Sequence, residues 1–341
     1  MARSKNAKIM MEQGQSLVDF VALTDSGDHT IFNPADLLLS GKDGFAPDIK
    51  PNGIVTGLNL VIAAVSGSND VVDVKAFTAN SKGTVHSVAA ATDESITRPA
   101  TDVAKVNSIT MDDTGAIAVI AGTDGATAAF SESRGVAGGP PYIPVDSVEI
   151  GQVRLTTTAA APITAAEIYQ TIGQHAESAS YPAYTMNNIG EGTLSDESAK
   201  VNAFLEFVEA LPLAHTGDTP KKVWVKYYTP SLAMLQKTSD FVPAETANSV
   251  STEEYYGGEV ASVSSSLNQA SFTSLLNDGV NDPEIAAKGE VITFKFYPNR
   301  TKAAFIVTQG TVSLSRTFAV ADQIATTVTI SPEVESSEFA S

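Results

Sequence analysis

The feature that most constrains the fold is a stretch near the C-terminus in which apolar and polar residues alternate. The runs Val291–Arg300 and Ala303–Phe318 predict three closely spaced strands, and Ile324–Ile330 predicts one more. A period of two turns successive side chains to opposite faces of a sheet. No catalytic constellation lies in this stretch, so the pattern favours a subunit that works by assembling.

Length and composition narrow the class of protein. A chain of 341 residues is longer than one compact core usually needs, so two domains are expected. The absence of cysteine excludes disulfides, thiolate metal sites and a cysteine nucleophile. The four histidines are too scattered for a zinc site built on local spacing. We therefore expect neither a metal nor a cofactor.

The formal net charge is −18 and is spread over both halves of the chain. This charge argues against binding nucleic acid through its phosphates, which needs clustered Lys and Arg. Two interpretations stay open. The charge keeps the protein in solution, which composition alone favours, or it forms a surface past which DNA slides.

The sequence predicts no membrane insertion. The longest apolar runs, such as Leu58–Val65, are far too short to span a bilayer. The basic start Met1–Lys8 is followed by Glu12 and Gln13 and lacks the apolar region of a secretory signal. We expect synthesis in the cytoplasm.

The predicted organisation has three parts. Residues 1–52 read as an irregular N-terminal arm. Residues 53–170 contain short strands at roughly ten-residue spacing and predict a β-sandwich-like accessory domain. Residues 171–341 form the second domain and its C-terminal arm, and this module is expected to fold without residues 1–170. The predicted fold class is mainly β.

Two short segments resemble catalytic or metal-binding patterns but are better explained as turns. Asp25–His29 groups a hydroxyl, two carboxylates and an imidazole, yet a triad is normally assembled from distant segments. Asp112–Gly115 lacks the alternating acidic ligands of a calcium loop. We predict no catalytic residues and expect a non-enzymatic protein.

Three features of the second domain bear on assembly. A polar loop is predicted over Ser239–Ser251. In Ser271–Ala287 the spacing of Phe272, Leu275 and Leu276 predicts one amphipathic helix. Aromatic residues concentrate here, and without accompanying Lys and Arg they favour core or interface packing over base stacking. They are Tyr227, Tyr228, Tyr255, Tyr256, Phe294, Phe296 and Tyr297.

The last third of the chain resembles the major tail tube protein of long-tailed, non-contractile (siphovirus-type) bacteriophages. The resemblance depends on the pattern and order of several segments and includes no catalytic signature. These segments are Ser239–Thr246, Tyr255–Gly258, Phe272–Gly279, Phe294–Pro298 and Gln309–Phe318.

The resemblance implies a tail-tube-type β-sandwich or barrel with one flanking α-helix, beside an N-terminal all-β domain. In that family the protomers close into rings, commonly hexameric, that stack through an extended loop and terminal arms. Trimeric rings are the alternative if the N-terminal domain is a diverged second tube domain. The resemblance places the helix at Phe272, Leu275 and Leu276, and the ring-stacking loop at Asp240, Phe241, Val242, Pro243 and Glu245.

The function implied is structural. The protein would form the tail tube of the virion, conduct DNA through an acidic lumen without specific binding, and contact the tape measure and terminator proteins. The alternative is another β-rich virion protein, such as a capsid decoration protein or a fibre or baseplate adhesin. A glycan-cleaving enzyme would need paired carboxylates in a groove.

Overall fold

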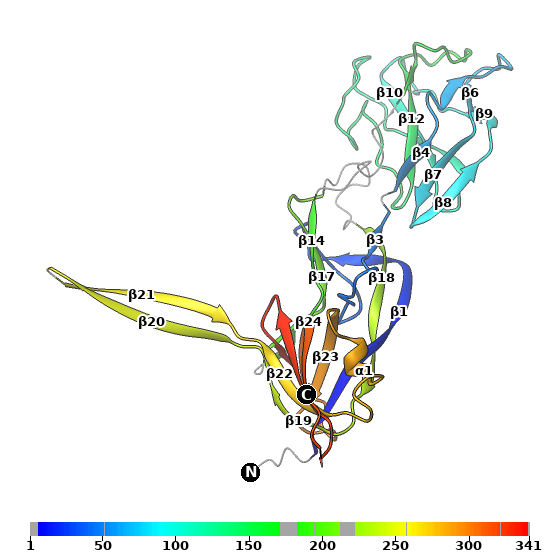
Figure 1. Cartoon of the computed structure of the whole chain (residues 1–341). Helices are drawn as coiled ribbons and strands as arrows, with labels where there is room; N and C mark the ends of the chain where they lie inside the picture. Colours follow the sequence, from blue (N-terminus) through cyan, green and yellow to red (C-terminus); the bar gives the residue numbers. More distant parts are fainter. Residues whose placement is uncertain are drawn as a thin grey trace.

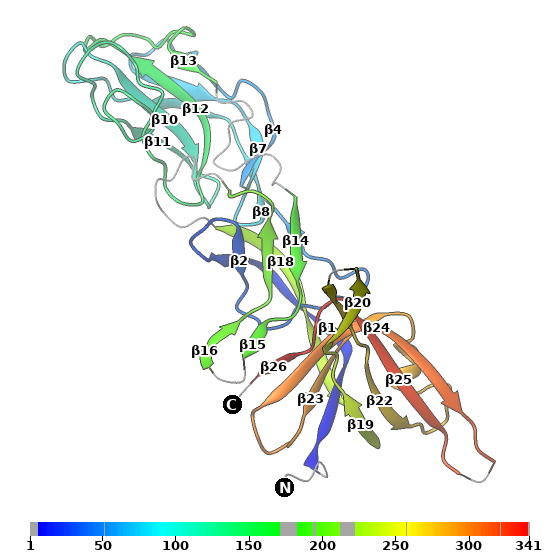
Figure 2. The ribbon, with the colours of Figure 1, turned by 90° about the vertical axis from the view of Figure 1, so that its left-hand side faces the viewer.

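The computed structural model describes residues 6–50, 52–170, 183–193, 196–211, 222–256, 258–320 and 322–339. In these residues the protein is mainly β, with 26 strands and one four-residue helix. Figures 1 and 2 show an elongated molecule with three parts: a β-domain at one end, a body at the other, and a hairpin that projects from the body.

The body is built on a twelve-stranded sheet that both ends of the chain contribute to. Its path runs through β14 (Tyr184–Asn187), β17 (Phe204–Phe207), β2 (Ile31–Asn33), β1 (Lys8–Asp25), β23 (Val291–Tyr297), β24 (Phe305–Thr317), β25 (Ala325–Pro332), β22 (Ala270–Leu275) and β19 (Thr238–Val242). Three strands join off this path: β18 (Val223–Met234), β3 (Asp48–Ile49) and β26 (Ser337–Phe339). The strands predicted at residues 291–300 and 324–330 are confirmed as β23 and β25, whereas the two strands expected within residues 303–318 are one continuous strand, β24.

The expected irregular arm at residues 1–52 is wrong for residues 8–25. These residues form β1, which pairs with β18 from Met10 to Leu23 and with β23 from Lys8 to Met11. The register of the β18 ladder shifts between Glu12 and Gly14 and again between Val18 and Val21. Each bulge changes which face the following residues occupy, so the strand shows no continuous alternation in the sequence.

Residues 52–170 form a separate β-domain with its own core. The apolar cluster that fills it lies between Leu60 and Ile163 and includes no residue of the body. A four-stranded sheet, with order β11-β10-β12-β13, lies with two three-stranded sheets, β4-β7-β8 and β5-β6-β9. The strands are β4 (Gly53–Thr56), β5 (Val61–Ala63), β6 (Val71–Val74), β7 (Phe77–Ser81), β8 (Thr84–Val88), β9 (Ala91–Ser95), β10 (Lys105–Met111), β11 (Ile117–Ala121), β12 (Val148–Leu155) and β13 (Ile168–Tyr169).

This domain is an insertion within the body. The chain enters it from β3 and returns to the body at β14, and both strands belong to the body sheet. At the junction the Trp224 indole N–H donates to Asp146 Oδ1 at 2.9 Å, and the turn at Gly83 packs directly on the ring of Phe20. The inserted domain therefore contacts β1 and β18, the two longest body strands that reach it.

The predicted helix over Ser271–Ala287 is wrong. Phe272 lies in β22, which pairs with β25, and helix α1 covers only Pro283–Ala286. Between them the Asp282 carboxylate accepts hydrogen bonds from three successive backbone N–H groups, at residues 277–279, and holds a turn at Gly279, whose φ is +77°. Phe272 and Leu276 are both buried, and their four-residue separation is the spacing expected for one face of a helix. Because Leu276 lies just after the end of β22, this spacing comes from a strand and the residue that follows it.

A buried carboxylate ties three segments of the body together. The side chain of Glu12, which is 2% exposed, accepts hydrogen bonds from the Gln15 amide at 2.9 Å, the Ser40 hydroxyl at 2.5 Å and the Thr293 backbone N–H at 3.1 Å. Three donors satisfy a charge that burial would otherwise make costly.

Replacing Glu12 with alanine should destabilise the body by about 3 kcal/mol, because three donors would lose their acceptor in a buried site. The measurement is the free energy of unfolding from urea denaturation. Gln13→Ala, on the exposed neighbour in the same strand, is the matched control and should change stability by less than about 0.5 kcal/mol. Equal effects of the two substitutions would contradict the role of Glu12.

Excising the inserted domain should leave the body folded. A variant with residues 52–170 replaced by a Gly-Ser linker of about ten residues should melt cooperatively in circular dichroism, because the body clusters include none of the removed residues. The fragment 171–341 should not, because it lacks β1. A cooperative melt of that fragment would show that β1 is dispensable.

Candidate functional site

The most prominent feature outside the cores is a β-hairpin that extends from the body (Figure 1). It consists of β20 (Thr246–Tyr255) and β21 (Gly258–Leu267), in register over ten residue pairs. Within the described part of the chain neither strand pairs with any other. An isolated two-stranded hairpin is only marginally stable in water, and its two outer edges expose backbone donors and acceptors.

The two faces of the hairpin differ. On one face two hydroxyl pairs bridge the strands, Ser249 with Ser264 and Ser251 with Ser262, each at 2.7 Å. On the other face Val250 lies opposite Val263, and both are about two-thirds exposed, at 67% and 69%. Exposed cross-strand valines on a thin ribbon are the type of surface that contacts another protein.

The hairpin has a fixed root. Ala244 is fully buried in the body core, and the Thr246 backbone N–H donates to Glu335 Oε1 at 2.8 Å. The hydrogen bonds from Thr246 lower the pKa of the Glu335 carboxyl. The Asn268 N–H donates to Glu245 O at 3.0 Å across the base of the hairpin. The arm thus projects from an anchored base.

The residues predicted to form the ring-stacking loop lie at this root. Most of the predicted loop is β-strand, in β19 and β20. Asp240, Phe241 and Val242 belong to β19, while Pro243 and Glu245 lie in the short connection to β20. The rest of the expected loop, up to Ser251, is the first half of β20. Its serines and threonines carry no apolar alternation, which is why the sequence suggested a loop. Gly258 begins β21 and lies opposite Tyr255 at the end of β20. The Gly-Gly dipeptide in the sequence at this point is a hairpin signal that could have revealed the arm.

The body sheet does not close into a barrel, because β19 ends it. In the described residues β19 pairs with β22 on one side only. A gap, here called the seam cavity, separates β19 from the start of β1 and has a volume of about 650 Å³. Its walls include the stacked rings of Phe241 and Phe296, whose centroids are 4.4 Å apart, and the side chains of Lys8 and Arg300.

On β22, β25 and β24, one face of the body sheet carries hydroxyl groups. The paired registers of β22, β25 and β24 place their outward side chains side by side, and apart from Leu275 and Ala325 all are serine or threonine. None of these outward side chains on the three strands is charged. This hydroxyl face comprises Ser271, Thr273, Thr311, Ser313, Ser315, Thr317, Thr327, Thr329 and Ser331.

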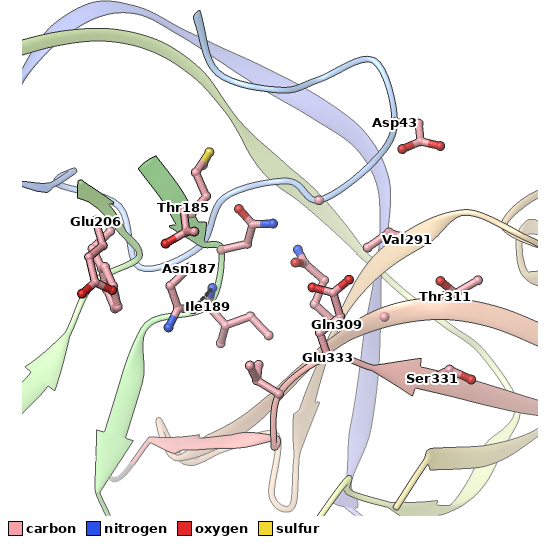
Figure 3. A pocket seen from close by; sticks show the side chains of 16 residues that line it. Asp43, Thr185, Asn187, Ile189, Glu206, Val291, Gln309, Thr311, Ser331 and Glu333 are labelled. Atoms are coloured by element: carbon pink, nitrogen blue, oxygen red, sulfur yellow. Dashed lines mark hydrogen bonds between the residues drawn. The ribbon is translucent and has the colours of Figure 1, made fainter. Parts of the chain in front are cut away.

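A second cavity, of about 470 Å³, lies between β14 and the β24–β25 pair (Figure 3). Its lining includes three carboxylates, Asp43, Glu206 and Glu333, and no Lys or Arg. Figure 3 shows Glu206 on the opposite side of the cavity from Asp43, with Glu333 between them beside Gln309. The carboxylates do not converge on one point, as a glycan-cleaving pair would.

The two segments that resembled catalytic or calcium patterns are turns. Asp25 Oδ1 accepts the backbone N–H groups of Gly27 and His29, and Asp28 Oδ1 accepts those of Thr30 and Ile31. Asp112 likewise accepts backbone N–H groups at residues 114 and 116. Among the described residues no group of three or more His, Asp or Glu side chains gathers in a way that would hold a metal ion.

The aromatic residues that the sequence concentrates in the second domain are divided between the body core and the seam cavity. Tyr227 is buried and donates its hydroxyl to Asp36 at 2.8 Å, and burial together with this carboxylate raises the pKa of the phenol. Phe294 is buried against Phe272, with ring centroids 5.6 Å apart. Phe296 lines the seam cavity.

No helix in the described residues has the length and apolarity needed to cross a membrane.

No protein-family model matches this chain, and no curated protein is similar to it in sequence.

The contribution of Asp28 to stability should depend on pH. The Ser26 hydroxyl and the backbone N–H groups of Thr30 and Ile31 hold the pKa of Asp28 well below its ordinary value of 3.8. Because the folded-state pKa is depressed, this stabilisation is complete above pH 3.8 and is lost as the pH falls through the folded-state pKa.

Asp28→Ala should therefore lower Tm at pH 7 by more than it does at about pH 2, as measured by circular dichroism. The exposed Asp43, replaced by alanine, serves as the control. An equal loss of Tm at both pH values would mean that the Asp28 carboxylate does not stabilise this turn.

Proposed function

We propose that this chain is a structural virion protein whose copies assemble into stacked rings and form the tail tube of a non-contractile bacteriophage, through which DNA passes. The observation that carries the proposal is the anchored hairpin, whose two outer edges have no partner strand among the residues that the structure describes. Such a ribbon exposes backbone donors and acceptors that a monomer leaves without protein partners. Pairing with further copies satisfies them.

The body adds a second reason for self-assembly. In the part of the chain that the structure describes, the sheet stays open at β19 and at β14, and open edges invite pairing with another copy of the same chain. Closed rings remove such edges by symmetry. Hexameric rings are proposed, with trimeric rings as the alternative. The partners of the finished tube would be the tape measure and terminator proteins at its ends.

The surface chemistry suits a conduit for a polyanion. A net charge of −18 repels DNA, and the hydroxyl face offers no Lys or Arg to hold a phosphate. The proposal therefore has DNA pass the wall without specific binding. The protein acts without catalysis, which agrees with three cavity carboxylates that do not converge (Figure 3).

Negative-stain electron microscopy of the purified protein over a range of concentrations tests the proposal. Hollow tubes or stacked rings with a central channel are expected, and they would give the ring symmetry. Particles that remain monomers, or elongated trimers without a channel, would contradict it and favour a capsid decoration protein or a fibre or baseplate adhesin.

The hairpin supplies a matched variant for the same experiment. Replacing residues 247–266 with a short Gly-Ser turn should keep the body folded, because the root residues Ala244 and Thr246 remain, and should abolish tubes. The control replaces the exposed turn Ser66–Ser68 of the inserted domain with glycines and should assemble normally. Tubes of normal length from the shortened hairpin would refute its role.

A further inference from the structure

We propose that the seam cavity is a socket that receives the tip of the β20–β21 hairpin of a second copy of this chain. The inference rests on the proposed function, since it takes the partner to be another copy in an assembly. It goes further by naming the two surfaces that meet. The lining residues that matter are Lys8, Ser239, Asp240, Phe241, Phe296 and Arg300.

Two backbone edges face the seam cavity. β18 follows β1 only as far as the Leu235 backbone N–H, which donates to Ile9 O at 2.9 Å, and then turns into β19. In the described residues β19 pairs only with β22, and Lys8 pairs only with Tyr297 of β23. An extended segment that enters the gap therefore finds main-chain donors and acceptors on both sides.

The cavity also offers an aromatic surface. The rings of Phe241 and Phe296 stack at 4.4 Å with an interplanar angle of 21°, and both are only partly buried. Asp240, with φ of +56°, sits at the bulge that shifts the register of β19 beside this pair. Aromatic anchors in a pocket are typical of the centre of a protein interface.

The side chains that line the cavity carry a net positive charge, which favours an acidic partner. Lys8 and Arg300 provide two cations against the single carboxylate of Asp240. Arg300 is held in place, because its Nε and Nη2 groups donate to the carbonyls of Asn6 and Ala7 at 3.2 and 3.1 Å. Its side chain is nevertheless exposed and available to a carboxylate.

The hairpin tip has the complementary composition. Its sequence from residue 253 to residue 259 contains three glutamates and two tyrosines and no Lys or Arg. Tyr256, at the turn, is fully exposed. Figure 1 shows the tip far from the β1 and β19 ends of its own body, so the tip that fills the cavity belongs to a second copy.

Cysteine cross-linking tests this contact directly, because the natural chain has no cysteine. Two single-cysteine variants, Tyr256→Cys and Ser239→Cys, are mixed at an assembling concentration and exposed to a mild oxidant. A disulfide needs Cα atoms within about 7 Å, so mixed dimers form only if tip and cavity meet. The control pairs Tyr256→Cys with Ser68→Cys, on the exposed surface of the inserted domain, and should give none.

Charge reversal provides an independent measurement. Lys8→Glu together with Arg300→Glu should raise the concentration needed for assembly about tenfold or more. Glu253→Lys together with Glu254→Lys in the same chain should restore it. A control reversal at Lys75, on the inserted domain, should leave assembly unchanged.

The outcomes separate this inference from the proposed function. Specific cross-links together with charge rescue would support the tip-to-cavity contact, and cross-linked dimers without tubes would support the contact while contradicting the tube. Tubes that form without the cross-link, or that tolerate the reversal, would overturn the contact and leave the tube standing. Monomers at every concentration would overturn both.

Discussion

The body depends on one constraint, the pairing of β1 with β18 on one edge and with β23 on the other. This strand joins the first residues of the chain to the last third and makes a single sheet from both. Its buried Glu12 adds hydrogen bonds to Ser40 and Thr293, so the same strand also fixes the segment that leads towards the inserted domain. With both ends of the chain committed to one sheet, residues 52–170 leave and re-enter the body as an insertion.

The same arrangement explains where the sheet stays open. The chain passes from β18 directly into β19, which pairs with β22 at the far end of the sheet path and leaves the seam cavity behind it. The chain then leaves the body at Glu245 and returns at Asn268, so the hairpin grows from the strand that ends the sheet. Within the described residues, the unpaired edge and the projecting ribbon are thus two consequences of one chain path, and the proposed assembly would use both.

Sequence reasoning succeeded where strands pair without bulges and alternate in composition. The β23–β24 and β24–β25 ladders have continuous registers, and their alternation predicted strands here correctly, although it divided β24 into two. It failed at β1, where two bulges break the alternation, and at Phe272–Leu276, where a strand end imitates helical spacing. It missed the hairpin because serine and threonine on both faces give no apolar contrast, and it missed the seam cavity because residues 8, 241 and 300 meet only in the folded chain. Composition did predict the acidic, cysteine-free character on which the functional proposal draws.

A chain with a net charge of −18 can self-associate only if its contact surfaces avoid bringing like charges together. The described surfaces meet this condition in two ways. The hydroxyl face is neutral, and so is the hairpin below its acidic tip, over residues 246–252 and 261–267, so their approach to another copy meets little local repulsion. The seam cavity instead concentrates cations, Lys8 and Arg300, in a protein that has few of them. Under the proposed function, this segregation of charge would let the remaining acidic surface repel DNA while the copies adhere, which is the combination that a conduit for a polyanion requires.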